Sequence, residues 1–106
     1  MINKPRVFVA VTLEATANAA NLPLFGNIVY LYASVPNIWT PSIEGDLIAR
    51  FDDLNFNPDL DFFAVSGTIP LSCIALATLV EEFGEIRTLL WDREKHGYRE
   101  KEIGNW

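Results

Sequence analysis

The sequence predicts a small α/β domain whose mostly parallel sheet ends in an antiparallel hairpin. Short runs rich in β-branched and aromatic residues alternate along the chain with helical patterns. These runs are apolar on both alternating faces, which is typical of strands buried on both sides. Parallel strands need crossover connections, and crossovers place helices over the faces of the sheet. With 106 residues, the chain has the length of a single domain, 1–106.

The first half of the chain contains two predicted strands. Residues 7–13 (VFVAVTL) form the first, and residues 14–21 (EATANAAN) follow as a short helix of weak propensity. Proline and glycine in residues 22–27 indicate a turn. Residues 28–33 (IVYLYA) form the second strand.

An amphipathic helix follows the second strand. Thr40 and Pro41 are typical of a helix start, because a hydroxyl suits the N-cap and proline suits the first helical position. The sequence at 55–59 (NFNPD) ends the helix. Apolar residues recur along one helical face, with acidic residues off that face: Ile43, Leu47, Ile48, Phe51 and Leu54.

The second half of the chain repeats the alternation. Residues 62–65 (FFAV) form the third strand, and a tight turn at 66–70 leads at once into a helix at 70–83. This helix is apolar almost all round, so we expect it to be covered on more than one side, and Gly84 suits its C-cap. A final strand at 86–91 then begins the hairpin.

The chain ends in a charged hairpin. His96 and Gly97 are typical of its tip, and the second strand of the hairpin runs over 98–103. Charges alternate in sign along it, which keeps an exposed ribbon from pairing edge to edge with another chain.

The charge balance excludes broad classes of partner. The chain has 14 acidic and 8 basic residues, with a net charge of -6 and no basic stripe. Duplex nucleic acid and anionic membrane surfaces are therefore not expected partners. A single cysteine cannot form an internal disulfide, and no apolar stretch is long enough for a signal peptide or a membrane span. We expect a cytoplasmic protein.

The carboxyl ends of the predicted strands are where a ligand site is expected, because open parallel sheets bind ligands there. The turn at 66–68 is the most informative of these ends, since a strand runs into Ser-Gly-Thr and a helix begins directly afterwards. The polar residues after the four strands are Thr12 and Glu14, Ser34 and Asn37, Ser66, Gly67 and Thr68, and Asp92.

Two interpretations of the 66–68 turn remain open. In the first, Gly67 lets the backbone approach a ligand, and the start of the helix binds a phosphate or carboxylate. In the second, Gly67 only permits the turn and the hydroxyls cap the helix. Arg93 or Arg99 in the hairpin could reach a phosphate at the same edge of the sheet, or could simply pair with neighbouring acidic residues.

For the other reactive side chains, the sequence favours structural roles. His96 is expected to be a solvated turn residue, and Cys73 a small buried hydrophobe in the last helix. The acidic residues between Glu44 and Asp61 are mostly the wet face of a helix, although carboxylates could in principle bind Mg²⁺. No nucleophile is placed beside a base, so catalysis is not expected, nor is a metal or other cofactor.

Residues 61–99 carry a family resemblance. The run from Asp61 to Pro70, the apolar helix, and then Leu89-Leu90-Trp91-Asp92-Arg93 with Tyr98 resemble the C-terminal half of small CRISPR-associated domains of the CARF-like or ring-nuclease type. The segment is equally similar to small α/β proteins of phages and archaeal viruses. The CRISPR-associated resemblance implies a dimer that binds a cyclic oligonucleotide across its two-fold axis, with Ser66, Gly67 and Thr68 lining the site.

Two functions follow as hypotheses. The first is a homodimeric binding module that holds a small anionic, nucleotide-like ligand at the 66–68 turn. The second is an acidic interaction or inhibitor protein, of viral origin for example, that docks on a basic protein without a small ligand. The homodimer is expected because the domain is small and carries Trp39, Trp106 and a helix that is apolar all round.

Overall fold

The protein is described by a computed structural model, which covers residues 4–11, 21–66 and 68–104. The predicted helix at 14–21 falls almost entirely outside the described residues. The elements, in chain order, are strand β1 (Arg6–Val11), a 3₁₀ turn η2 (Leu22–Leu24), β2 (Asn27–Tyr32), helix α1 (Ile43–Asp53), β3 (Phe62–Ala64), helix α2 (Ile69–Phe83), β4 (Glu85–Asp92) and β5 (Gly97–Gly104).

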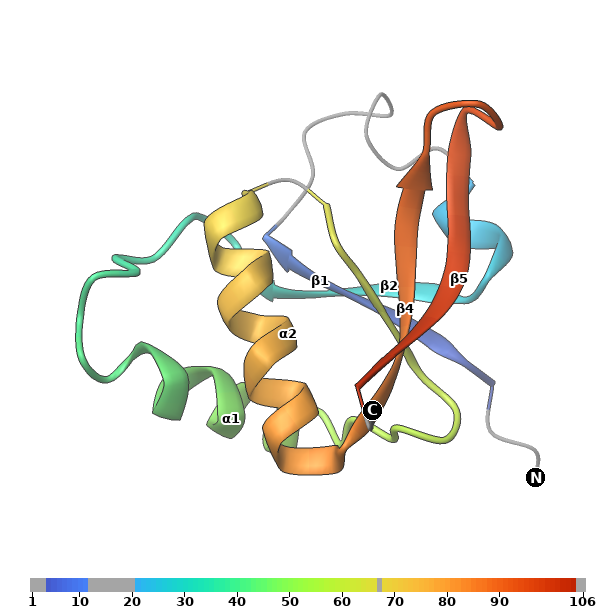
Figure 1. The fold of residues 1–106 in the computed structure, drawn as a ribbon. Coiled ribbons are helices and arrows are strands. Elements are labelled where there is room, and N and C mark those ends of the chain that lie inside the picture. Colours follow the sequence, from blue (N-terminus) through green and yellow to red (C-terminus); the bar gives the residue numbers. More distant parts are fainter. Residues whose placement is uncertain (1–3, 12–20, 67, 105–106) are drawn as a thin grey trace.

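These strands form one mixed sheet, in the order β2-β1-β3-β4-β5. The pairs β1–β2, β1–β3 and β3–β4 are parallel, and β4–β5 is the antiparallel hairpin. The predicted α/β class, with a mostly parallel sheet and a C-terminal hairpin, is therefore confirmed. In Figure 1, α1 and α2 lie to one side of the strands and η2 lies to the other.

Both faces of the central strands are buried, as their apolar sequences predict. On one face, Phe8 and Phe63 pack with residues of α1 and α2 in the larger core. On the other face, Val7 and Val9 pack with Leu22 of η2 in a smaller core. Successive side chains of β1 thus enter two different cores, because side chains alternate across a strand.

Helix α1 begins later than the sequence predicts. Its N-cap is Ser42 and its first residue is Ile43, so the expected start at Thr40 and Pro41 is wrong. Residues 40–43 instead form a turn, in which the Ile43 N–H donates to the Thr40 carbonyl at 3.2 Å. The first bond of α-helical spacing runs from the Asp46 N–H to the Ser42 carbonyl, at 3.0 Å. The predicted apolar face is correct, with Ile43, Leu47 and Phe51 buried.

Helix α2 has the predicted extent but not the predicted burial at every position. Leu71, Ala75 and Leu79 face the larger core. Cys73 is exposed, so its expected burial is wrong. The helix packs against α1 and the sheet, and these neighbours leave a third side open. Gly84 ends the helix with a φ of +91°, in the positive region that glycine adopts without strain.

The hairpin forms as predicted, except that its turn spans residues 93–96 and Gly97 already belongs to β5. Glu85 to Asp92 pair in register with Gly104 to Gly97. His96 lies exposed in the turn with a φ of +53°, which fits the solvated turn residue expected there. On one face of the hairpin the Arg87 guanidinium stacks over the Phe62 ring at 4.2 Å and pairs with Glu100 at 3.2 Å. Arg87 therefore ties the charged ribbon to the central sheet.

Candidate functional site

The strand order creates a topological switch point between β1 and β3. The described part of the connection from β1 to β2 contains η2, whose Leu22 belongs to the smaller core, whereas α1 and α2 contribute to the larger core on the opposite face. The described parts of the connections that follow the neighbouring strands β1 and β3 therefore lie on opposite faces of the sheet. In open α/β sheets, ligands bind outside the carboxyl ends of such strands. Here that place lies after Val11 and Ala64, beside the 66–68 turn.

Ser66 anchors this turn to two other elements. The Tyr98 hydroxyl of β5 donates to Ser66 Oγ at 2.8 Å, and the Ser72 hydroxyl of α2 donates to the Ser66 carbonyl at 3.1 Å. Ser66 is itself buried. Its side chain thus fixes the path of the backbone at the switch point and is already hydrogen-bonded within the protein.

Thr68 occupies the N-cap of α2 and is half-buried. Its backbone is extended, and its carbonyl accepts from the Ser72 N–H at 3.0 Å. Its hydroxyl makes no side-chain cap hydrogen bond, so the capping role expected for this hydroxyl is wrong in this structure. Two further predicted site residues, Gly67 and Thr12, lie outside the described residues.

Asn21 contributes to the same edge of the sheet and was missed in the sequence. Its side-chain amide pairs with the backbone of Tyr98: the Tyr98 N–H donates to Asn21 Oδ1 at 2.6 Å, and Asn21 Nδ2 donates to the Tyr98 carbonyl at 3.0 Å. Gly97 allows this close fit, because a Cβ there would lie 3.0 Å from Asn21 Oδ1. Asn21 thus holds Tyr98, which in turn holds Ser66.

Asp92 and Arg93 lie at the end of β4, on the carboxyl edge of the sheet. Asp92 accepts the Glu94 N–H at 2.9 Å and pairs with Arg99 at 2.7 Å. The Arg99 guanidinium, together with the backbone N–H groups of Glu94 and Lys95, holds the pKa of Asp92 below its ordinary value. Asp92 therefore shapes the hairpin turn. Arg93 is exposed in that turn, and an open depression of about 550 Å³ includes Arg93 and Trp91.

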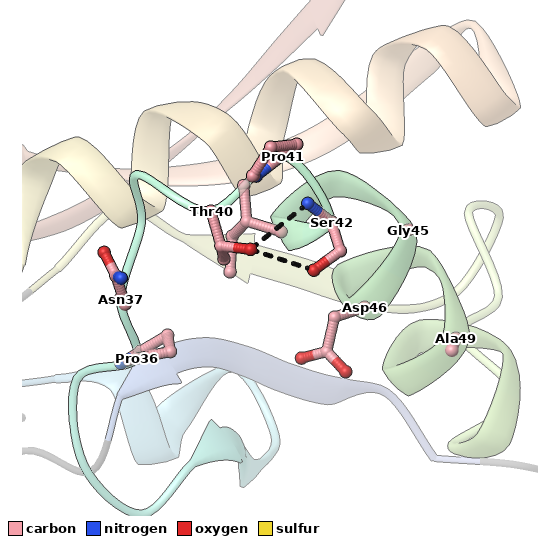
Figure 2. Close-up of a pocket in the computed structure, with 9 residues that line it drawn as sticks. Pro36, Asn37, Thr40, Pro41, Ser42, Gly45, Asp46 and Ala49 are labelled. Carbon is pink, nitrogen blue, oxygen red and sulfur yellow. Dashed lines mark hydrogen bonds between the residues drawn. The ribbon is translucent and has the colours of Figure 1, made fainter.

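Asn37 lies in a different place from the 66–68 turn. It lines an open groove of about 630 Å³ between the loop after β2 and the start of α1 (Figure 2). Its Oδ1 accepts the Trp39 N–H at 3.0 Å, which shapes the loop. Neither Ser66 nor Thr68 lines this groove. The structure therefore does not bring Asn37 together with the other predicted site residues.

One carboxylate of that groove is part of a charged network. Asp46 accepts a hydrogen bond from the Tyr32 hydroxyl and another from Arg50 Nε at 3.0 Å. Arg50 also stacks over the Tyr32 ring and donates to the Leu31 carbonyl. Burial, followed by the hydrogen bond to Asp46, raises the pKa of Tyr32 to about 12. The network fastens α1 to the end of β2.

The acidic run does not form a metal site in the described part of the chain. Asp61 is only 1% exposed and pairs with Arg6 at 2.9 Å, and its Oδ2 also accepts the Asn57 N–H at 2.8 Å. It is therefore a structural carboxylate that closes the loop before β3. No group of three or more His, Cys, Asp or Glu among the described residues could hold a metal ion.

Comparison with known proteins adds no relative. No family model, curated protein or solved structure matches the chain. The fold alone defines the class, which is a small α/β domain with a mostly parallel five-stranded sheet and an antiparallel edge hairpin. None of the helices in the described segments has the length and apolar character needed to cross a membrane.

Proposed function

We propose that this domain binds a small anionic, nucleotide-like ligand at the switch point, beside the 66–68 turn. The observation that carries the proposal is the strand order, because it puts the end of β3 at the place where doubly wound sheets bind ligands. Directly after that strand, the 15-residue helix α2 begins. The first turn of a helix offers N–H groups without partners in the helix and a positive dipole end, which suit a phosphate.

In this proposal, each residue of the turn has a different role. Ser66 holds the backbone in place through Tyr98 and Ser72. The Thr68 hydroxyl, which makes no cap bond, contacts the ligand together with the first amides of α2. Arg93 supplies positive charge from the hairpin. We propose binding and not catalysis, because the hydroxyl of Ser66 is buried and hydrogen-bonded to Tyr98.

A thermal-shift screen tests this function. The probes are inorganic phosphate, nucleoside mono- and triphosphates and cyclic oligonucleotides. A ligand at a hundred times its Kd stabilises the native state by about 2.7 kcal/mol, which raises the Tm of a domain of this size by about 10 °C. No shift with any of these probes would contradict the proposal.

Two matched variants separate ligand contact from helix capping. Thr68→Asp puts a good N-cap residue at α2, so the fold is kept, but its carboxylate repels an anion. Ser42→Asp makes the same kind of change at α1, whose N-cap also lacks a side-chain cap bond. We expect Thr68→Asp to abolish the ligand-induced shift and Ser42→Asp to preserve it. Equal ligand shifts in both variants would place the ligand elsewhere.

We further propose that the working form is a cytoplasmic homodimer. Its support is the small size of the domain together with large exposed side chains such as Trp39. The resemblance of residues 61–99 to CARF-like domains makes a cyclic oligonucleotide one of the ligands to test first. A dimer would offer it two copies of the 66–68 turn.

A second candidate function is supported by the charge of the helical layer. Helices α1 and α2 expose six carboxylates and include one basic residue, Arg50, which is paired with Asp46. Such a surface suits docking on a basic protein without any small ligand. This function predicts no thermal shift with the anionic probes. It also predicts salt-sensitive binding to a basic partner, weakened by Asp52→Asn with Asp53→Asn.

A further inference from the structure

One stretch is the longest run of the chain without a charged side chain. Residues 15–43 contain no Asp, Glu, Lys or Arg, although 21% of the chain is charged. The described part of this stretch contains η2, β2 and the loop that leads to α1. Within this stretch, β2 is one of the two outer strands of the sheet, so that part of it forms the β2 edge (Figure 1).

The same stretch concentrates exposed hydrophobic side chains. Of the six large hydrophobic residues exposed in the described part of the chain, four lie within it. Trp39 is 86% exposed and Leu24 is 85% exposed, and Tyr30 and Val35 are the other two. Tryptophan and tyrosine are prominent among the residues that dominate binding energy at protein interfaces.

The two edges of the sheet are protected very differently. Along the outer strand β5, residues 99–102 are Arg, Glu, Lys and Glu, and charges of this kind block pairing with another chain. The other outer strand, β2, has the sequence NIVYLY, without charge or proline. An edge strand of that kind is a template for a further strand.

We propose that the β2 edge is the homodimer interface, where two copies of β2 pair antiparallel about a two-fold axis. A closed dimer needs a surface that complements itself, and an edge strand meets this need when it pairs antiparallel with its own copy. The two sheets would then join into one. The proposal rests on the homodimer proposed above and not on the ligand site.

Charge favours a second copy of the chain at this edge over another face or a basic partner. Each chain has a net charge of -6, and contact between two helical layers would bring their exposed carboxylates together. The β2 edge is neutral, so two copies meet there without this repulsion. A basic partner would find no carboxylate on residues 15–43 to pair with.

The interface has a defined centre and a feasible area. Arg50 already donates to the Leu31 carbonyl at 2.7 Å, so we assign the pairing segment to Asn27–Tyr30. A standard interface takes about 800 Å² from each partner. That is roughly one eighth of the 6637 Å² surface of this chain. Tyr30, which is exposed, lies within this segment.

Sedimentation and light scattering of charge variants test the interface. The wild type is expected at twice the 11.9 kDa chain mass at micromolar concentration. Tyr30→Lys and Tyr30→Glu each place like charges near the axis, so each alone is expected to weaken the dimer at least tenfold. Mixing the two variants should restore the dimer mass. Ile69→Lys, which changes an exposed hydrophobic residue on α2, should leave the dimer unchanged.

Hydrogen exchange of the wild type provides a second measurement that needs no variant. Those backbone amides of Asn27–Tyr30 that point away from β1 should become more protected as the protein concentration rises. A wild-type mass of 11.9 kDa, or dimers that persist in both Tyr30 variants, would overturn the interface. Ligand shifts at the 66–68 turn are measured separately, so failure of one proposal is distinguishable from failure of the other.

Discussion

Replacement of Leu79 by alanine tests whether α2 seals the larger core. Leu79 is 1% exposed and packs in the cluster that also contains Phe8, Phe51 and Phe63. The substitution removes three carbon atoms from a filled site, and such changes cost about 2–5 kcal/mol. We expect about 3 kcal/mol here. That is a large part of the roughly 5–15 kcal/mol that stabilises a native protein.

Leu76→Ala is the internal control for this prediction. Leu76 lies on the same helix but is only half-buried, so its truncation removes less buried surface and leaves a site open to water. We expect about half the cost, or about 1.5 kcal/mol. Urea denaturation measures both variants, provided that the m-value stays constant. Equal losses, or a loss below about 1 kcal/mol at Leu79, would refute the assigned packing of α2.

Three further predictions concern polar groups. Tyr32 has a pKa raised to about 12, so it should keep its proton in the folded state at a pH near 10, where an unfolded tyrosine loses it. The stability of the protein should therefore fall as pH rises from 10 to 12. Absorbance titration of the folded protein checks the raised pKa. Asn21→Ala should lower stability by about 1–3 kcal/mol in a melting experiment, because Tyr98 loses two backbone partners. The Glu85 carboxylate, by hydrogen bonding and by its charge, raises the pKa of Glu102, so the folded state holds the Glu102 proton more tightly than the unfolded state does. Stability should therefore fall as pH rises above 4.5. Glu102→Gln should reduce this fall, as measured by denaturation across that pH range.

Much of the fold was predictable because the strands are apolar on both faces. The segment VFVAVTL can be buried only inside a layered structure, and β1 lies there. The strand order was not predictable, because it depends on which face each connection covers. That choice is made by distant packing, such as Leu22 against Val7 and Val9.

The burial of α2 shows the limit of pattern alone. Its residues are apolar almost all round, so the sequence does not distinguish the buried face of the helix. Cys73 was therefore wrongly predicted to be buried. The start of α1 was predicted wrongly for a different reason. Thr40 and Pro41 also suit the turn that precedes a helix, and Ser42 competes for the same N-cap.

The candidate site was predicted in part. The turn beside Ser66 and Thr68 followed from the rule for strand ends, and the strand order then placed it at the switch point. The support of that turn was not predictable. Asn21 and Tyr98 are separated by 77 residues, and Ser66 and Tyr98 by 32, so no local pattern links them. The structural role of Asp61 was likewise not predictable, because it depends on pairing with Arg6, which is 55 residues away in the sequence.

Titration of the ¹⁵N-labelled protein with inorganic phosphate and ATP tests the ligand site most directly. The amide signals of Ser66, Thr68, Ile69 and Leu71 should move with a common saturation curve, because these amides surround the start of α2. The amides of Ile43 and Glu44, at the start of α1, should stay in place. Unchanged signals at 66–71, or equal movement at both helix starts, would contradict a specific anion site at the switch point.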